Sequence, residues 1–191
     1  MAKVNYFQRF FFSMLFLASI GLDMAHASPV STVPFKVDVT GILNNDERGA
    51  ASNIILDFYV GAGASITSLG WNVNVTSFPG SYLSEMQITF SDSQGDGVTF
   101  TPGFGDDVDG TMDYAGFQDL GVLGEIFQVG ADGILRLEFH DGYKDLAFDE
   151  PEGVWNFGEL TFGVAQVPEP PSIPLMMSGL LLLAHAARRR R

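Results

Sequence analysis

Hydrophobic and polar residues alternate along much of the chain that follows residue 28. In residues 34–43, Phe35, Val37 and Val39 are separated by polar neighbours, and residues 133–142 show the same alternation. Successive side chains of a strand point to opposite faces of its sheet, so a period of two predicts strands with one buried face. Further strands are predicted at residues 53–60, 66–75, 85–90, 98–101, 124–129 and 154–164.

The segments between these strands are rich in Gly, Pro, Asp and Ser, which favour turns. No part of the body keeps the helical period of about 3.6 over several turns, so no helices are expected to make the crossovers that parallel strands need. The pattern predicts an all-β domain at residues 28–166, an antiparallel β-sandwich of jelly-roll-like form. Residues 66–92 and 152–164 also resemble strands of galactose-binding-like and proprotein-convertase P-type sandwich domains.

Composition supports a packed domain and limits its chemistry. Hydrophobic residues make up 46% of the chain and include 17 Phe, so a core can form. Cys is absent, which excludes disulfides, thiolate metal sites and cysteine catalysis. The net charge is −13, and no Lys or Arg occurs between residues 49 and 135. Such a body repels phosphate backbones, so nucleic acid is not an expected partner.

The first 27 residues have the three parts of a secretory signal peptide. A basic start (Lys3 and Arg9) is followed by the apolar residues 10–22 and then by small residues. This order predicts export by Sec-type machinery and cleavage of the signal. An uncleaved anchor is the alternative, but the apolar stretch is shorter than the roughly 20 residues that span a bilayer as a helix. The predicted cleavage residues are Ala25, Ala27 and Ser28.

The body offers few groups for catalysis. His140 is its one histidine, and it falls on the polar face of a predicted strand, which indicates an exposed surface residue. Zinc sites usually need three protein ligands and a catalytic triad needs a base beside its nucleophile, and the sequence shows neither set. No glycine-rich phosphate-binding motif is present either. We therefore expect the protein not to be an enzyme.

One acidic segment has the character of a calcium-binding loop. Residues 92–97 place oxygen-bearing side chains at the first, third and fifth positions and Gly at the sixth, and further acids follow in residues 106–113. Calcium would stabilise an exported domain that has no disulfides. Turn formation is the simpler explanation, because Asp and Gly are common turn residues. The candidate ligands are Asp92, Gln94, Asp96, Asp106, Asp107, Asp109 and Asp113.

Two tryptophans, Trp71 and Trp155, fall on predicted strands. Large apolar side chains usually lie in the core, so the simplest interpretation is that both bridge the two sheets. The alternative is an exposed pair that stacks on sugar rings.

The chain ends in three segments of different chemistry. The Pro-rich residues 168–174 favour an extended stalk, because proline removes backbone donors and keeps the preceding residue extended. Residues 173–187 are apolar or small apart from Ser178 and His185, and as a helix they would be about 22 Å long, against about 30 Å of bilayer hydrocarbon. They form a marginal membrane span, with the terminal arginines on the cytoplasmic side.

This order of Pro-Glu-Pro, apolar helix and terminal arginine cluster resembles the PEP-CTERM sorting signal of exported bacterial proteins. The resemblance implies membrane insertion through residues 173–187, recognition by the membrane enzyme exosortase, and cleavage near the Pro-Glu-Pro. It also implies that the protein occurs together with extracellular polysaccharide production and biofilm. A permanent C-terminal anchor is the alternative. The resemblance covers residues 167–191 and rests on Pro168, Glu169, Pro170, Arg188, Arg189, Arg190 and Arg191.

We therefore expect an exported protein, first held in the inner membrane with its body outside the cytoplasm, and then at the cell surface or extracellular. The expected role is a structural or interaction role. One alternative is a calcium-assisted carbohydrate-binding module, which needs exposed aromatic residues beside the acids. The other is a small hydrolase, which needs two carboxylates that face each other in a cleft.

Overall fold

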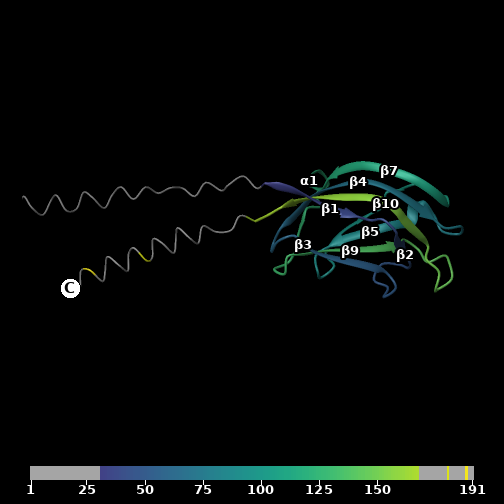
Figure 1. The fold of residues 1–191 in the computed structure, drawn as a ribbon, viewed down its shortest axis with the longest axis horizontal. Helices are drawn as coiled ribbons and strands as arrows, with labels where there is room; N and C mark the ends of the chain where they lie inside the picture. Colours follow the sequence, from purple (N-terminus) through teal and green to yellow (C-terminus); the bar gives the residue numbers. More distant parts are fainter. Residues whose placement is uncertain (1–30, 168–179, 181–187, 189–191) are drawn as a thin grey trace, which may run out of the picture.

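The computed structural model of the protein describes residues 31–167, Leu180 and Arg188. In residues 31–167, ten strands form two sheets that pack face to face (Figure 1). The strands are β1 (Thr32–Asp38), β2 (Ile42–Asn44), β3 (Ile54–Tyr59), β4 (Ser65–Ser77), β5 (Met86–Ser91), β6 (Gly97–Phe100), β7 (Gly110–Asp119), β8 (Phe127–Gln128), β9 (Ile134–Asp141) and β10 (Gly153–Ala165). The helical segments are a 3₁₀ turn (Leu83–Glu85) and α1 (Leu120–Leu123).

The strands of both sheets pair antiparallel. In the first sheet β1, β10, β4 and β7 lie in that order, with β2 beside β10 and β8 beside β4. In the second sheet the order is β3, β9, β5 and β6. The pairs are nested along the chain, because β1 with β10 and β3 with β9 enclose β4 with β7 and β5 with β6. The prediction of an all-β antiparallel fold is confirmed.

Aromatic side chains from both sheets form the centre of the core. Phe90 of the second sheet packs edge-on against Phe162 of the first, with ring centroids 5.2 Å apart. Phe139 packs in the same way against Trp155, with centroids 5.5 Å apart. All four side chains are fully buried. Burying each of them stabilises the fold by about 1.5–3 kcal/mol. The inward positions of β9 and β10 are apolar for this reason, and the resulting alternation is the pattern that predicts these strands.

A buried polar residue, Asn44 of β2, also joins the sheets. Its Nδ2 donates hydrogen bonds to the backbone oxygens of Gln87 and His140 in the second sheet. Its Oδ1 accepts a hydrogen bond from Trp155 Nε1 at 2.8 Å. A buried amide is unfavourable unless its polar atoms are paired, so Asn44 favours the one alignment of the sheets that satisfies it.

His140 is buried, so the prediction of an exposed histidine is wrong. Its side chain is 2% exposed, with Nε2 at 2.8 Å from Thr89 Oγ1 and Nδ1 at 3.0 Å from the backbone oxygen of Asp141. The outer face of β9 is covered here by residues 45–53, in which Glu47 pairs with Asp141. Burial lowers the pKa of His140, because desolvation disfavours the charged imidazolium.

Two elements depart from the sequence pattern. β7 is not predicted, because it is an edge strand whose mostly exposed residues do not alternate. The strand predicted at residues 124–129 is reduced to β8, and α1 precedes it. Asp119 caps α1 by accepting hydrogen bonds from the backbone nitrogens of Gly121 and Val122, and Gly124 ends the helix with a left-handed φ of 74°.

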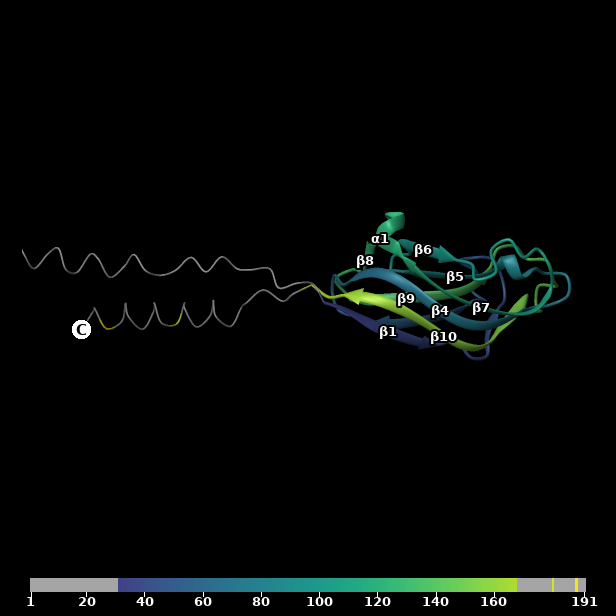
Figure 2. The same ribbon diagram turned by 90° about the horizontal axis from the view of Figure 1, so that it is seen from above.

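Both ends of the domain lie at the same end of the sandwich. Thr32 at the start of β1 pairs with Ala165 at the end of β10, and Figures 1 and 2 show the two strands side by side. This is named the proximal end. The opposite, distal end includes three loops, at residues 78–85, 101–109 and 142–152. The chain therefore enters and leaves the domain at the proximal end.

Candidate functional site

The two tryptophans do not form an exposed sugar platform. Trp155 is fully buried between the sheets. Trp71 packs against Phe100 of the opposite sheet, with ring centroids 4.6 Å apart. Gly116 of β7 lies against the Trp71 ring so closely that a Cβ there would clash with it. The structure contradicts an exposed pair and supports the simpler interpretation, in which both residues bridge the two sheets.

The first group of predicted calcium ligands belongs to a self-contained turn. Residues 92–96 join β5 to β6 near the proximal end. Asp92 Oδ1 accepts hydrogen bonds from the backbone nitrogens of Gln94 and Asp96, both at 2.9 Å. Gly95 supplies the left-handed φ of 95° that the turn needs. An Asp side chain that bonds to the backbone in this way closes a turn without a cation.

The second group lies on the far side of β6, toward the distal end. Asp106 accepts a hydrogen bond from Tyr114 Oη at 2.6 Å, and Asp107 accepts one from Ser84 Oγ at 2.7 Å. Asp109 is exposed in the same loop. Burial and the neighbouring Asp106 raise the pKa of Tyr114, because both disfavour the phenolate. Asp106 and Asp107 thus accept hydrogen bonds from β7 and from the loop at residues 78–85, rather than facing a common cation site.

Asp113 lies outside that loop, on β7, and accepts a hydrogen bond from Asn74 Nδ2 at 2.7 Å. The seven predicted ligands are thus divided among a turn, a loop and a strand. No group of three or more His, Asp or Glu within the described residues has an arrangement that could hold a metal ion. Calcium binding stays a prediction.

Buried carboxylates lie beneath the distal loops. Asp141 and Glu152 are 1% and 0% exposed, and Lys144 Nζ lies 2.8 Å from Glu152 Oε1. Burial, with smaller contributions from the charges of Glu85 and Glu152, raises the pKa of Asp141 to about 8. Burial and the neighbouring Asp145 also raise the pKa of Glu85. Asp141 and Glu152 are therefore enclosed rather than open to a cleft.

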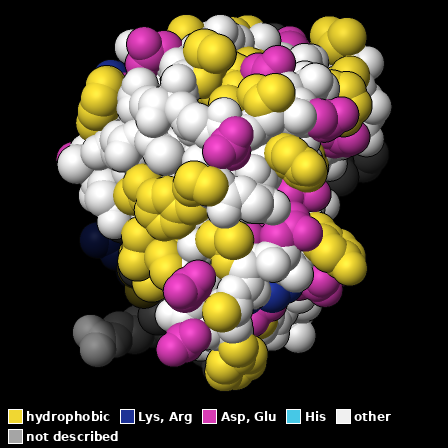
Figure 3. All heavy atoms as spheres, turned by 90° about the vertical axis from the view of Figure 1, so that its right-hand side faces the viewer, with side chains coloured by type: hydrophobic (Ala, Val, Ile, Leu, Met, Phe, Trp, Pro, Cys, Tyr) yellow, Lys and Arg dark blue, Asp and Glu magenta, His cyan; other side chains and the backbone are white. Residues whose placement is uncertain are grey.

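Apolar side chains protrude from the distal end. Phe104 is 90% exposed and Phe148 is 87% exposed, and Tyr82, Val108 and Tyr143 are also exposed. Figure 3 looks onto this end and shows hydrophobic side chains interspersed with acidic ones. Exposed apolar groups that gather in one region of a soluble protein often mark an interaction site. These five residues are named the distal surface.

The alternation that predicts strands misses the distal surface, because its residues lie in turn segments. One signal in the sequence does point to it. Phe104 stands between Gly103 and Gly105, and Phe148 stands among acids in a segment that ends with Pro151. An aromatic residue within turn-forming residues has no strand that would carry it into the core.

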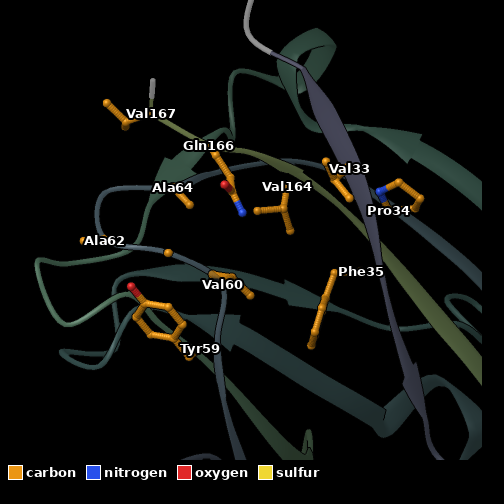
Figure 4. A pocket seen from close by; sticks show the side chains of 11 residues that line it. Val33, Pro34, Phe35, Tyr59, Val60, Ala62, Ala64, Val164, Gln166 and Val167 are labelled. Carbon is orange, nitrogen blue, oxygen red and sulfur yellow. The ribbon is translucent and has the colours of Figure 1, made fainter. Parts of the chain in front are cut away.

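The proximal end has a crevice of about 490 Å³. Val33 and Phe35 of β1 line one side, and Tyr59 and Val60 line the other (Figure 4). The crevice therefore opens between the edge strands β1 and β3 of the two sheets. Val167 also lines it, which places the crevice where the C-terminal tail begins.

Most of the predicted sorting and cleavage residues lie outside the described residues. They are Ala25, Ala27, Ser28, Pro168, Glu169, Pro170, Arg189, Arg190 and Arg191. The apolar residues 173–187 lie outside them as well, apart from Leu180. In the part of the chain that the structure describes, no helix has the length and hydrophobicity needed to cross a membrane.

The fold and the tail together define an all-β domain with a C-terminal sorting segment. Residues 166–191 match the PEP-CTERM protein-sorting motif, which confirms the resemblance of the tail. The resemblance of residues 66–92 and 152–164 to galactose-binding-like and P-type sandwich domains stays a prediction. The motif implies an exported protein that is anchored in the membrane and then processed, with exosortase as the processing partner. No curated protein and no solved structure matches the chain.

Proposed function

We propose that the protein is a non-catalytic binding protein of the cell surface or the extracellular matrix. A signal peptide directs it to Sec-type export, and the tail brings it to exosortase. Cleavage near residues 168–170 then frees the β-sandwich, which is the functional part of the molecule. The released β-sandwich acts within extracellular polysaccharide.

The points at which the chain enters and leaves the domain carry this proposal. Because Thr32 pairs with Ala165, the tail and the N-terminal segment both join the domain at the proximal end. The distal surface, which includes Phe104 and Phe148, lies at the opposite end. A domain held by its tail presents these side chains away from the point of attachment, and a released domain keeps them accessible.

Two further observations support a scaffold for binding rather than an enzyme. His140, the one histidine between residues 28 and 166, is buried, and Asp141 and Glu152 are enclosed beneath the surface. The nested strand order also supports the finer prediction of a jelly-roll form, in which rigid strands carry the loops. Binding residues are commonly found on loops that such a scaffold holds in place.

A carbohydrate-binding module is the second candidate. The observation that favours it is the proximity of exposed aromatic rings, such as Tyr82 and Tyr143, to carboxylates in the same three loops. Rings supply flat apolar faces for sugars, and carboxylates accept hydrogen bonds from hydroxyl groups. In this candidate the distal loops replace the tryptophan pair as the sugar site.

The intact mass of the protein recovered from its host tests the sorting part of the proposal. Membrane and extracellular fractions are measured separately. We expect a product that begins at Ser28 and ends near residues 168–170. A membrane-bound product that still carries Arg191 would contradict the proposal, because the tail would then be a permanent anchor.

A further inference from the structure

Packing does not account for the side chains of the distal surface. The hydrophobic core is complete without Phe104 and Phe148, which belong to no buried cluster. Phenylalanines that protrude into water add no stability. Phe104 and Phe148 are the two most exposed large hydrophobic side chains of the described residues, and both lie at this end, where other molecules can pack on them. Aromatic side chains are also enriched at the centres of protein interfaces. These residues are therefore candidates for contact with a partner.

Hydrogen bonds between the loops hold this surface in place. The backbone nitrogen of Leu83 donates to the oxygen of Val108 at 2.9 Å, which joins the first two distal loops. The backbone nitrogen of Gly142 donates to the oxygen of Glu85 at 2.8 Å, which joins the third. A surface on fixed loops loses less conformational entropy on binding than one on free loops.

The charges of the three loops restrict the partner. The one basic residue in them is Lys144, whose Nζ already contacts Glu152 Oε1 and the backbone oxygens of Asn45 and Glu150. An anionic polymer is repelled by such a surface, and so is a second copy of this acidic chain, whereas a cationic partner is attracted. The exposed acids of the three loops are Asp107, Asp109, Asp145, Asp149 and Glu150.

We propose that the distal surface binds a basic polypeptide segment that carries both apolar side chains and Arg or Lys. The rings of Phe104 and Phe148 contact the apolar side chains and the faces of guanidinium groups. The surrounding carboxylates pair with the remaining cations. A neutral glycan would use the rings but not the negative charge, so the charge favours the polypeptide. This inference rests on the proposed role as a binding protein.

Peptide binding, followed by fluorescence anisotropy, tests the inference on the whole chain purified in a non-ionic detergent. Three labelled probes of about twelve residues alternate Arg with Leu, Arg with Ser, and Glu with Leu. We expect the Arg–Leu probe to bind at least about tenfold more tightly than the other two. Added salt should weaken this binding, because it screens exposed charges.

Exposed aromatic residues at the two ends provide the variant and its matched control. The double variant Phe104→Ser, Phe148→Ser should weaken binding of the Arg–Leu probe by about tenfold or more. Tyr59→Ser should leave the affinity unchanged, because Tyr59 is 72% exposed but lies at the proximal end. Since these side chains support little packing, all variants should unfold at the temperature of the unmodified protein.

Equal affinity for the three probes would overturn the inference, and so would unchanged affinity of the double variant. Tighter binding of a neutral glucan oligosaccharide than of the Arg–Leu probe, lost in the double variant, would also overturn it, because the surface would then be a carbohydrate site. The mass measurement in the host is independent of these results. A correctly processed protein that binds no probe refutes only the inference, whereas an unprocessed protein that binds the Arg–Leu probe refutes only the sorting step.

Discussion

Asp141 is a single carboxyl group whose surroundings make folding depend on pH. Its folded pKa of about 8 lies above the roughly 4 expected for an unfolded Asp. Between these values the folded protein holds a proton that the unfolded chain releases. This contribution to stability is therefore present at low pH and is lost as the pH rises toward 8. Glu85, whose pKa is also raised, acts in the same direction, and the ammonium of Lys144 pairs with Glu152 instead.

We expect Asp141→Asn to be more stable than the unmodified protein at pH 8 by several kcal/mol, up to about 5 kcal/mol. The amide cannot ionise, and each unit of pKa shift corresponds to about 1.4 kcal/mol. At pH 4 or below, where the unfolded chain also holds this proton, the two proteins should unfold at more similar temperatures. Thermal unfolding followed by circular dichroism at both pH values measures the difference. A variant that is less stable at pH 8 would show that the folded protein favours the carboxylate.

Asn44 provides a second prediction for a single residue. Asn44→Leu removes the acceptor of Trp155 Nε1 and leaves that buried donor unpaired. We expect a loss of about 2–4 kcal/mol in the free energy of unfolding, measured with urea. The control is Asn72→Leu, because Asn72 is exposed on β4 and should change stability by less than about 0.5 kcal/mol. Equal losses in the two variants would refute a role of Asn44 in joining the sheets.

Among the elements, β10 shows how one strand serves both the core and the surface. A shift of its pairing register between Trp155 and Phe157 marks a β-bulge. The bulge places Asn156 and Phe157 on the outer face, where Asn156 Nδ2 donates to Asn74 Oδ1 at 2.8 Å. The strand then returns Leu160 to the core. One extra residue thus restores the alternation that buries the rest of the strand.

The bulge depends on Gly158, which has a φ of 124° and lies against the backbone of Asn72. We expect Gly158→Ala to reduce the free energy of unfolding by more than about 3 kcal/mol, because it adds a steric clash to backbone strain. Gly105→Ala is the control, since its φ of 91° carries the strain but its surroundings are open. It should cost about 1 kcal/mol. Equal effects in urea unfolding would mean that the clash with Asn72 is unimportant.

The elements that the sequence predicts are those whose side chains alternate between core and solvent. β9 and β10 belong to this class, because their inward residues are fully buried. β7 does not, since hydrogen bonds to β4 hold it at the edge while most of its side chains remain exposed. Pairing with a neighbouring strand is a long-range interaction, and a local pattern does not contain it.

The candidate site was less predictable than the fold, for the same reason. The alternating pattern of β9 puts His140 on the polar face, which predicts an exposed residue, but residues 45–53 fold over it. Asp92 and Asp106 are close in sequence, yet β6 separates them in space. The distal surface arises where three loops meet that are far apart in sequence. Each of these outcomes depends on tertiary contacts rather than on residue type or spacing.

At the scale of the whole molecule, the proposed function assigns delivery and binding to separate parts. The strands of the domain end at Ala165, and the sorting motif begins at residue 166. The domain therefore needs no residue of the motif to complete its sheets. The distal surface lies at the end opposite to Ala165, after which the motif begins, so changes in one part should leave the other unaffected.

This separation gives the last prediction. Changing Pro168, Glu169 and Pro170 together to Ala should abolish processing, so that protein carrying Arg191 accumulates in the membrane of an exosortase-containing host. The temperature of thermal unfolding should change by less than about 2 °C, because the last strand of the sandwich ends at Ala165, before the changed residues. Phe104→Ser is the reciprocal control and should be processed normally. A clear fall in unfolding temperature would show that the Pro-Glu-Pro segment packs against the domain, for which the crevice beside Val167 is the available place.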